Sequence, residues 1–220
     1  ILIKLLILLI SIMSMILGST VAINQKNIKR LLAYSSIYHM GFIILGILTA
    51  NEIGTKSVLL YISIYMITIL GIFSCLLCIK DGKDGYYLEE INSFSGLLKK
   101  NPFLSFSIAV LLFSLAGIPP MAGFFSKLYI LISVVESKLY FLAIVAVITS
   151  VISAFYYLKI IKAIFFDIPQ NNIFCEVPYI YKIFIFLSVL LTLFFIFFAS
   201  KILDFIVFHP LILLIINFSK

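Results

Sequence analysis

The chain contains 220 residues, of which 64% are hydrophobic and only 11% are charged, and its mean hydropathy is +1.25. Soluble proteins contain about 45–50% apolar residues, and a globule of this size could not hide so much apolar surface from water. This composition excludes a soluble enzyme, a secreted disulfide scaffold and a disordered chain, and it indicates a protein that folds in a bilayer. The net charge of +7 is then explained by an excess of cations on one side of a membrane rather than by binding to nucleic acid.

Six apolar stretches are long enough to cross a membrane as helices, since a hydrocarbon core of about 30 Å requires about 20 residues. They are Ile3–Ile23, Leu31–Ala50, Ser57–Ile79, Pro102–Val135, Leu139–Leu158 with an extension towards Phe166, and Tyr179–Ala199. The sequence therefore predicts an all-α, polytopic transmembrane helix bundle of about six spans. The apolar segment Phe205–Asn217 contains Pro210 and is too short to cross, so we expect it to lie at the membrane interface.

The positive charges are distributed unequally between the two sides of the predicted bundle. Alternating helices place the connections after the first, third and fifth spans on one side, which carries ten cations against five on the other. The ten are Lys26, Lys29, Arg30, Lys80, Lys83, Lys99, Lys100, Lys159, Lys162 and Lys182, and the five are Lys4, Lys56, Lys138, Lys201 and Lys220. The positive-inside rule predicts that the ten-cation side faces the matrix or the cytoplasm.

The fourth stretch is predicted to be a broken helix. Its 34 residues would form a straight helix of about 51 Å, much longer than the hydrocarbon core. Gly117, Pro119, Pro120 and Gly123 interrupt it, because adjacent prolines remove two donors and clash with the preceding turn. Carbonyls freed at this depth are tolerated only when they are buried in protein or line a wet cavity. We therefore expect an internal, partly hydrated site at the break, with a proline kink that serves only packing as the alternative.

Lys127 is the candidate functional residue of this stretch, seven residues after Pro120. A lysine in the bilayer interior costs roughly 2.5–3.5 kcal/mol on insertion scales. A buried lysine also changes readily between its charged and neutral forms. A switchable cation beside a broken helix is the pattern expected of a proton or ion relay. The alternative is a lysine that snorkels to the interface and anchors the end of its helix.

Other polar residues lie along single faces of the predicted helices. His39 is a candidate relay group because imidazole takes up and releases protons near physiological pH, and a hydrogen-bonded packing histidine is the alternative. Tyr65 in the third helix and Tyr157 in the fifth are candidates for lining a polar channel. For any single hydroxyl, a hydrogen bond that joins two helices is the simpler interpretation. The other hydroxyl-bearing residues on these faces include Ser35, Ser36, Tyr61, Thr68, Ser150, Ser153 and the adjacent Tyr156.

The three cysteines do not suggest a site. Cys75 and Cys78 form a C-x-x-C inside an apolar stretch, where two small packing residues are a simpler interpretation than redox or metal chemistry, and Cys175 stands apart. The sequence contains no nucleotide-binding loop, metal-ligand cluster, haem pattern or nucleophile triad. We therefore expect no cofactor, metal or redox centre in this chain.

Two long motifs resemble the antiporter-like membrane subunits of respiratory complex I. The first is Gln25–Gly41 (QKNIKRLLAYSSIYHMG), and the second is Ser114–Lys127 (SLAGIPPMAGFFSK). Asn101-Pro102 and the stretch Ala154–Lys162 fit the same pattern. The tyrosines of the third helix favour the family of chain 2 of NADH:ubiquinone oxidoreductase, because its two larger relatives usually carry a His/Lys motif there. The resemblance covers roughly residues 1–166.

The resemblance implies two inverted five-helix repeats, each with a broken helix, of which this chain contains only the second plus a final helix. We expect residues 1–166 to form that repeat and residues 167–220 to form the final transmembrane helix and an interfacial tail. We favour a split protein, in which another chain supplies the missing N-terminal half, over a fragment of a longer chain. A half of this kind is expected to turn a polar stripe towards lipid when it is alone.

The implied function is proton translocation across the mitochondrial inner membrane, driven by electron transfer from NADH to ubiquinone. Lys127 matches the family's lysine on the second broken helix, which is proposed to pass protons towards the outer face. NADH, FMN, iron–sulfur clusters and quinone are expected in other subunits. The expected partners are other membrane-arm subunits and the bilayer, without nucleic acid.

Two other functions are open on the sequence alone. One is a subunit of a cation/proton antiporter or membrane hydrogenase of the same superfamily. The tyrosine-bearing third helix argues against it, as does an abundance of residues with A/T-rich codons, which is typical of organelle genomes. The other is a structural membrane subunit without conduction. Lys127 and the double-proline break argue against that role, because a spacer needs neither.

Overall fold

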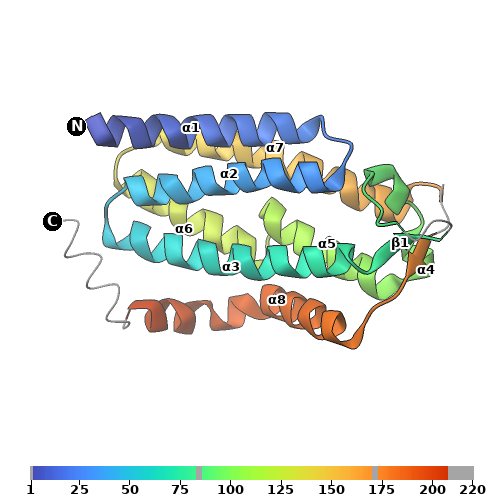
Figure 1. Cartoon of the computed structure of the whole chain (residues 1–220). Helices are drawn as coiled ribbons and strands as arrows, with labels where there is room; N and C mark the ends of the chain where they lie inside the picture. Colours follow the sequence, from blue (N-terminus) through green and yellow to red (C-terminus); the bar gives the residue numbers. More distant parts are fainter. Residues whose placement is uncertain (1, 83–85, 170–172, 208–220) are drawn as a thin grey trace.

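The computed structural model describes residues 2–82, 86–169 and 173–207, and for residues 196–207 it describes only the helical backbone (Figure 1). Long helices dominate this part of the chain. They are α1 (Leu2–Ile23), α2 (Ile28–Leu48), α3 (Glu52–Leu76), α5 (Pro102–Ala116), α6 (Ala122–Glu136), α7 (Tyr140–Phe166) and α8 (Tyr179–Val207). The short elements are β1 (Ile79–Asp81), η1 (Ile91–Phe94), α4 (Leu97–Lys100) and β2 (Ile173–Cys175). The predicted helical membrane bundle is confirmed.

Asparagine side chains begin three of these helices. Asn27 accepts hydrogen bonds from the backbone N–H groups of Lys29 and Arg30, and Asn51 accepts one from Gly54. Asn101 caps α5 in the same way, with Pro102 in the first helical turn, where its missing N–H costs nothing. Because these caps lie outside the apolar stretches, α2 and α3 begin earlier than the hydropathy pattern predicts.

The spans differ from the predicted ones mainly at their ends. Within the described residues, α1, α2, α3 and α7 are each long and apolar enough to cross a membrane, and the shorter α5 and α6 follow one another as the two halves of the predicted broken span. Ile79 is not helical but begins β1, which pairs antiparallel with β2 outside the spans. Residues 205–207, the first of the predicted interfacial tail, continue α8 to Val207, because no helix breaker precedes Pro210. Residues 208–217 lie outside the described residues.

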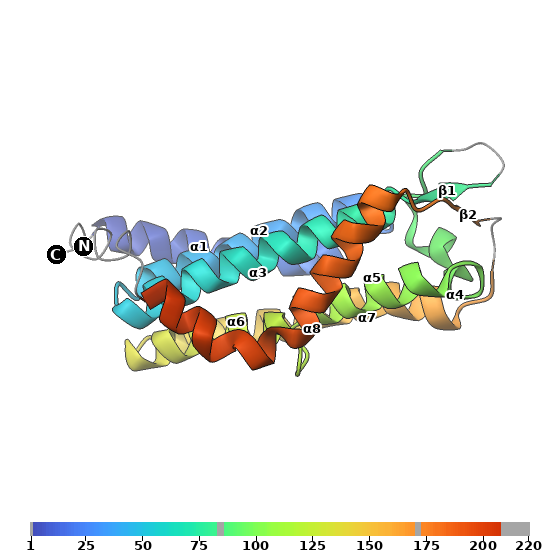
Figure 2. The same cartoon turned by 90° about the horizontal axis from the view of Figure 1, so that it is seen from below.

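The helices form two layers that meet around the middle of the bundle. Figure 2 shows α1, α2 and α3 in one layer and α5, α6 and α7 in the other, with α8 crossing from the first layer towards the second. Small residues let α1 approach α2 closely, since a Cβ on Gly18 would lie 2.4 Å from the backbone nitrogen of Tyr38. The predicted polar stripe facing lipid does not lie on α1. Its exposed large side chains are apolar, including Leu5, Leu9 and Met13.

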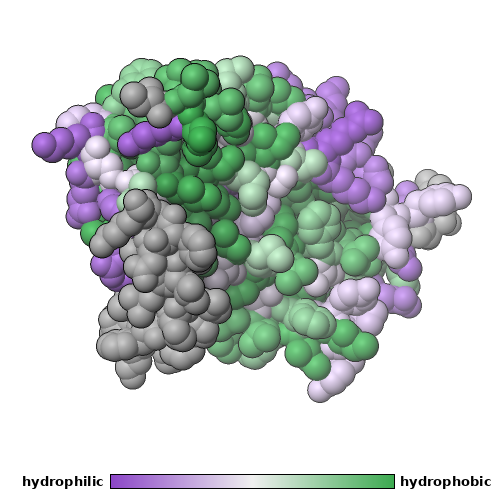
Figure 3. All heavy atoms as spheres, turned by 60° about the vertical axis from the view of Figure 1, so that its left-hand side comes forward, coloured by the Kyte–Doolittle hydropathy of each residue, from purple (hydrophilic) through white to green (hydrophobic). Residues whose placement is uncertain are grey.

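The connections after α1, α3 and α7 lie together at one end of the bundle, as the cation count assumed (Figure 1). In Figure 3 hydrophilic residues gather towards the edges of the face in view, whereas apolar residues cover its middle. This distribution matches a bilayer around the middle of the helices. Lys83 and Lys220 lie outside the described residues, and nothing is described of the Lys201 side chain.

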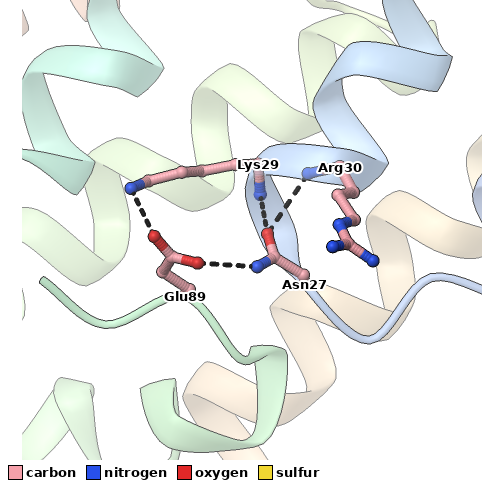
Figure 4. Close-up of polar contacts among 4 residues, drawn as sticks. All are labelled: Asn27, Lys29, Arg30 and Glu89. Carbon is pink, nitrogen blue, oxygen red and sulfur yellow. Dashed lines mark hydrogen bonds and ion pairs between the residues drawn. The ribbon is translucent and has the colours of Figure 1, made fainter.

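A polar clamp holds the long connection between α3 and α5 against the start of α2 (Figure 4). The Lys29 Nζ atom lies 2.7 Å from Glu89 Oε1, and the Asn27 side-chain amide donates to Glu89 Oε2 at 2.8 Å. These hydrogen bonds, with that from Lys29 the stronger, hold the pKa of the Glu89 carboxyl below its usual value. Lys29 is therefore paired rather than being only an orientation charge.

Candidate functional site

The break between α5 and α6 is built by Gly117 and the two prolines after it. Gly117 adopts a left-handed conformation with φ of 83°, which favours glycine, and its N–H closes α5 on the carbonyls of Phe113 and Ser114. Pro119 and Pro120 cannot continue the helix, and α6 begins only at Ala122. The four predicted break residues, including Gly123 at the start of α6, therefore lie between or beside two half-helices, as expected.

Lys127 satisfies the carbonyls that the break sets free. Its Nζ donates to the carbonyl oxygens of Leu115 at 2.9 Å and Ala116 at 3.0 Å, at the C-terminal end of α5. The C-terminal end of a helix carries partial negative charge, so it is a favourable place for an ammonium group. Only 6% of Lys127 is exposed, which is inconsistent with a lysine that snorkels to the interface. No ion pair in the described part of the chain involves Lys127.

Two glycines permit this arrangement. A Cβ on Gly117 would lie 2.9 Å from the Cδ atom of Lys127, so any larger residue would push the lysine away from the carbonyls. A Cβ on Gly123 would lie 1.8 Å from the carbonyl oxygen of Ser114, so α5 and α6 could not approach each other as they do. The N–H of Gly123 instead donates to the Ser114 hydroxyl at 3.1 Å. The break and the lysine position thus depend on each other.

His39 is held at both ring nitrogens by tyrosine hydroxyls. Its Nδ1 lies 2.7 Å from the Tyr61 oxygen and its Nε2 lies 3.0 Å from the Tyr157 oxygen, with only 2% of the residue exposed. A neutral imidazole has one donor and one acceptor, so one tyrosine donates to the ring and the other accepts from it. The Tyr65 ring packs beside the His39 ring, with centroids 4.9 Å apart and ring planes tilted by 39°, whereas the hydrogen bonds at the two ring nitrogens are those with Tyr61 and Tyr157.

A small cavity lies between Lys127 and His39. Its volume is about 10 Å³ of space for the centre of a water molecule, close to the smallest that can hold one water. It is lined by His39, Tyr61, Ile64, Tyr65, Thr68, Ser114, Leu115, Gly123, Ser126 and Lys127. Three helical segments, α2, α3 and the broken pair α5–α6, therefore bring the two predicted titratable residues to one small cavity.

Of the predicted site residues, Lys127, His39 and Tyr65 line this cavity, and Tyr157 contacts it only through His39. The serines that share a face with His39 are turned to their own helix, since Ser35 and Ser36 donate to the carbonyls of Leu32 and Ala33. A cavity around the break is thus formed by tyrosines and the broken helix rather than by these serines.

Three tyrosines lie at the site although the sequence did not single them out as functional. The sequence placed Tyr61 only on a polar stripe. In the structure it makes the shorter of the two hydrogen bonds to His39. Tyr38 lies under the lysine, with Lys127 Nζ 5.3 Å from its ring centroid, a cation–π distance. The buried hydroxyls of Tyr38 and Tyr156 have no hydrogen-bond partner of suitable geometry within the described residues. Their positions directly before His39 and Tyr157 are the signal that could have drawn attention to them.

The cysteines are not part of this site. Cys75 is fully buried, and the Cys78 thiol donates to the carbonyl of Ser74 at 3.1 Å, an ordinary bond within a helical turn. Cys175 lies in β2, whose partner strand β1 starts directly after Cys78. Within the described ranges, no three His, Cys, Asp or Glu side chains gather as they would around a metal ion.

Comparison with known proteins gives the family of the chain. The family described as NADH:quinone oxidoreductase/Mrp antiporter, transmembrane, matches residues 1–153. NADH-quinone oxidoreductase subunit N of Pelagibacter ubique is 49% identical over 195 residues, which are 89% of this chain and 41% of that protein. The chain therefore spans about two fifths of the length of this curated relative.

Solved structures show the same architecture. A chain of respiratory complex I from Thermus thermophilus with bound aureothin matches with a TM-score of 0.77 and 28% identity, over 90% of this chain and 44% of that one. A chain of the Mrp complex from Dietzia sp. DQ12-45-1b matches with a TM-score of 0.66 and 25% identity, over 77% of this chain and 31% of that one.

Proposed function

The chain belongs to the NADH:quinone oxidoreductase/Mrp antiporter transmembrane family, and on this premise we propose that it is a proton-translocating membrane subunit of an NADH:quinone oxidoreductase. The observation that carries the proposal is a buried lysine on the carbonyls of a broken helix, separated by a water-sized cavity from a histidine held by two tyrosines. A chain with only structural duties would gain nothing from this costly arrangement.

Lys127 has the donors that a relay step requires. An ammonium group has three N–H bonds, and the carbonyls of Leu115 and Ala116 take two of them. The third N–H is left for a water in the adjoining cavity. Loss of the proton weakens the attraction of the nitrogen to the two carbonyls, because their hydrogen bonds are then no longer charge-assisted. The charge and the position of the side chain are thereby coupled.

His39 and its two tyrosines would continue the path. When a proton arrives at the ring nitrogen that was accepting a hydrogen bond, both nitrogens become donors. The tyrosine that donated to that nitrogen must then turn its own O–H elsewhere, and release from the other nitrogen completes the transfer. Tyr61 on α3 and Tyr157 on α7 lie on opposite ring nitrogens, so the path runs across the bundle.

The remaining features of the proposal concern the whole assembly. Residues 1–166 would form the second antiporter-like repeat and residues 167–220 the final helix and tail, with α8 packed on α3, α5 and α6. The first repeat would come from another chain, or from a longer form of this one, since these residues span 41% of the relative's length. Oxidation of NADH and reduction of ubiquinone would take place in other subunits, which would hold the FMN, iron–sulfur clusters and quinone.

We place the protein in the mitochondrial inner membrane, with the end that carries Lys29, Arg30 and Lys99 facing the matrix. The A/T-rich codon bias of its abundant residues supports this location. The relative from Pelagibacter ubique is bacterial and supports a bacterial cell membrane instead, with the same end facing the cytoplasm. Fractionation of cells that express the tagged chain, followed by protease protection of the Lys99 end, distinguishes these locations.

A cation/proton antiporter subunit is the second candidate, favoured by the match to the Mrp complex. The complex I chain covers more of this chain and superimposes better, which supports the first candidate. Proton uptake by sealed vesicles separates them. NADH-driven uptake is expected from an oxidoreductase, whereas uptake driven by a sodium gradient without NADH would indicate the antiporter.

Two variants of Lys127 test the relay itself. Lys127→Met keeps the apolar stem but removes the group that binds the proton. Lys127→Arg keeps a positive charge, but the guanidinium does not release its proton in proteins. Both variants are expected to assemble and to lose NADH-driven proton uptake, whereas Lys159→Met, at an exposed lysine of α7, retains it. Proton uptake and NADH oxidation are measured per assembled complex. Normal uptake in Lys127→Arg would leave Lys127 with a structural role only.

A further inference from the structure

A half-open apolar pocket of about 230 Å³ lies between α3, α6 and α8, beside the cavity of Lys127. Its walls include Leu60, Ile64 and Ile67 of α3, Ala122 of α6, and Leu191 and Phe195 of α8. The two hydroxyls in its lining are used within their own helices, since Ser63 donates to Leu59 and Thr192 donates to Ser188 and Val189. The pocket therefore offers water almost nothing to bind.

A bend in α8 creates the pocket. The helix lies directly against α3 at one level, where a Cβ on Gly71 would be 2.7 Å from the Cβ of Ser188. Beyond that contact, Thr192 turns its hydroxyl back to the carbonyls of the preceding turn, a bond that bends helices. Figure 2 shows α8 changing direction near its middle, over the junction of α5 and α6. The diverging helices leave a wedge of space beside residues 190–195.

The pocket lies at a depth that an acyl chain reaches from the end of α8. Thr192 follows Lys182 by ten residues, which is about 15 Å along a helix and half of a hydrocarbon core of about 30 Å. Lys182 is exposed, in none of the ion pairs of the described residues, and Tyr179 beside it is 77% exposed. An exposed lysine and tyrosine at a helix end are typical of the headgroup level.

We propose that one acyl chain of an anionic phospholipid occupies this pocket, with the phosphate of the same lipid at Lys182. The apolar lining suits a hydrocarbon chain, the pocket opens beside exposed apolar side chains of α8 such as Leu187 and Phe194, and the cation of Lys182 lies about one leaflet depth away. Ile64 lines both this pocket and the Lys127 cavity. The bound chain thus covers the outer side of the wall that separates the Lys127 cavity from the bilayer.

Photolabelling tests this proposal in the protein purified from its membrane together with its partner subunits. The probe is a phosphatidylglycerol with a diazirine at the end of one acyl chain, and the labelled peptides are identified by mass spectrometry. We expect label in segments 60–67 and 190–195. Ile67→Trp fills the pocket and should abolish that label, whereas Met66→Trp, at a neighbouring residue that is 52% exposed and outside the pocket, should retain it. Leu191→Trp and its control Leu187→Trp repeat the test from α8.

The headgroup contact is tested separately. One lysine near a membrane surface is worth about fivefold in binding of an anionic lipid, so Lys182→Ala should lower the labelling about fivefold, and Lys159→Ala should not. Label spread evenly over all lipid-facing segments, equal label in Ile67→Trp and Met66→Trp, or a crosslink to a neighbouring protein subunit would each overturn the proposal. Labelling is read without proton transport, so its outcome is independent of the function proposed for Lys127.

Discussion

Gly117→Ala should disable the site although no titratable residue is replaced. Gly117 has φ of 83°, and a residue with a Cβ in this left-handed conformation costs about 1–2 kcal/mol. The new Cβ would also lie 2.9 Å from Lys127 Cδ, so the lysine must shift from the carbonyls of Leu115 and Ala116. A hydrogen bond to a charged group contributes about 1.5–3 kcal/mol. Loss of one such bond together with the backbone cost should lower the free energy of unfolding by about 2.5–5 kcal/mol.

Gly96→Ala is the matched control. Gly96 has φ of 82°, so the backbone cost is the same, but its Cβ would meet Pro169 in the connections outside the membrane, at 2.6 Å. Thermal unfolding in detergent should show that both variants are less stable. Proton uptake per assembled complex should fall only in Gly117→Ala. Normal uptake in Gly117→Ala, or an equal loss in Gly96→Ala, would show that the contact between Gly117 and Lys127 does not support transport.

Three further predictions follow from individual contacts. Tyr157→Phe removes the hydroxyl at His39 Nε2, so it should lower the free energy of unfolding by about 1–3 kcal/mol and reduce proton uptake. Tyr156→Phe removes a buried hydroxyl without a hydrogen-bond partner in the described residues and should not lower stability. Equal unfolding temperatures for the two variants would contradict this prediction. Gly123→Ala should force α5 and α6 apart and reduce assembly, measured as the yield of intact complex, because its Cβ would lie 1.8 Å from the Ser114 carbonyl. The lowered pKa of Glu89 means that its clamp stabilises the fold above the usual glutamate pKa and is lost as the pH falls through the folded pKa. The difference in unfolding temperature between wild type and Glu89→Gln should therefore shrink in acid, and a constant difference would refute the assignment.

The membrane fold follows largely from composition and local rules. Continuous apolar stretches set the number of spans, because a bilayer requires each backbone group to be satisfied within a helix. Two adjacent prolines fix the break at residues 117–121, since their rings exclude a helix whatever surrounds them. The helix starts were less accurate, as at α3, because the cap of Asn51 is a polar signal outside the apolar pattern.

The contacts within the site were decided by tertiary structure. Lys127 and His39 could each be singled out from the sequence, because a titratable residue inside an apolar stretch is costly wherever it lies. Their partners could not, since Tyr61 and Tyr65 are one turn apart on the same face of α3 and only the rotation of that helix against α2 determines which hydroxyl reaches His39. The carbonyls that hold Lys127 were equally hidden, because the angle between two half-helices depends on the helices packed around them, which no local pattern encodes.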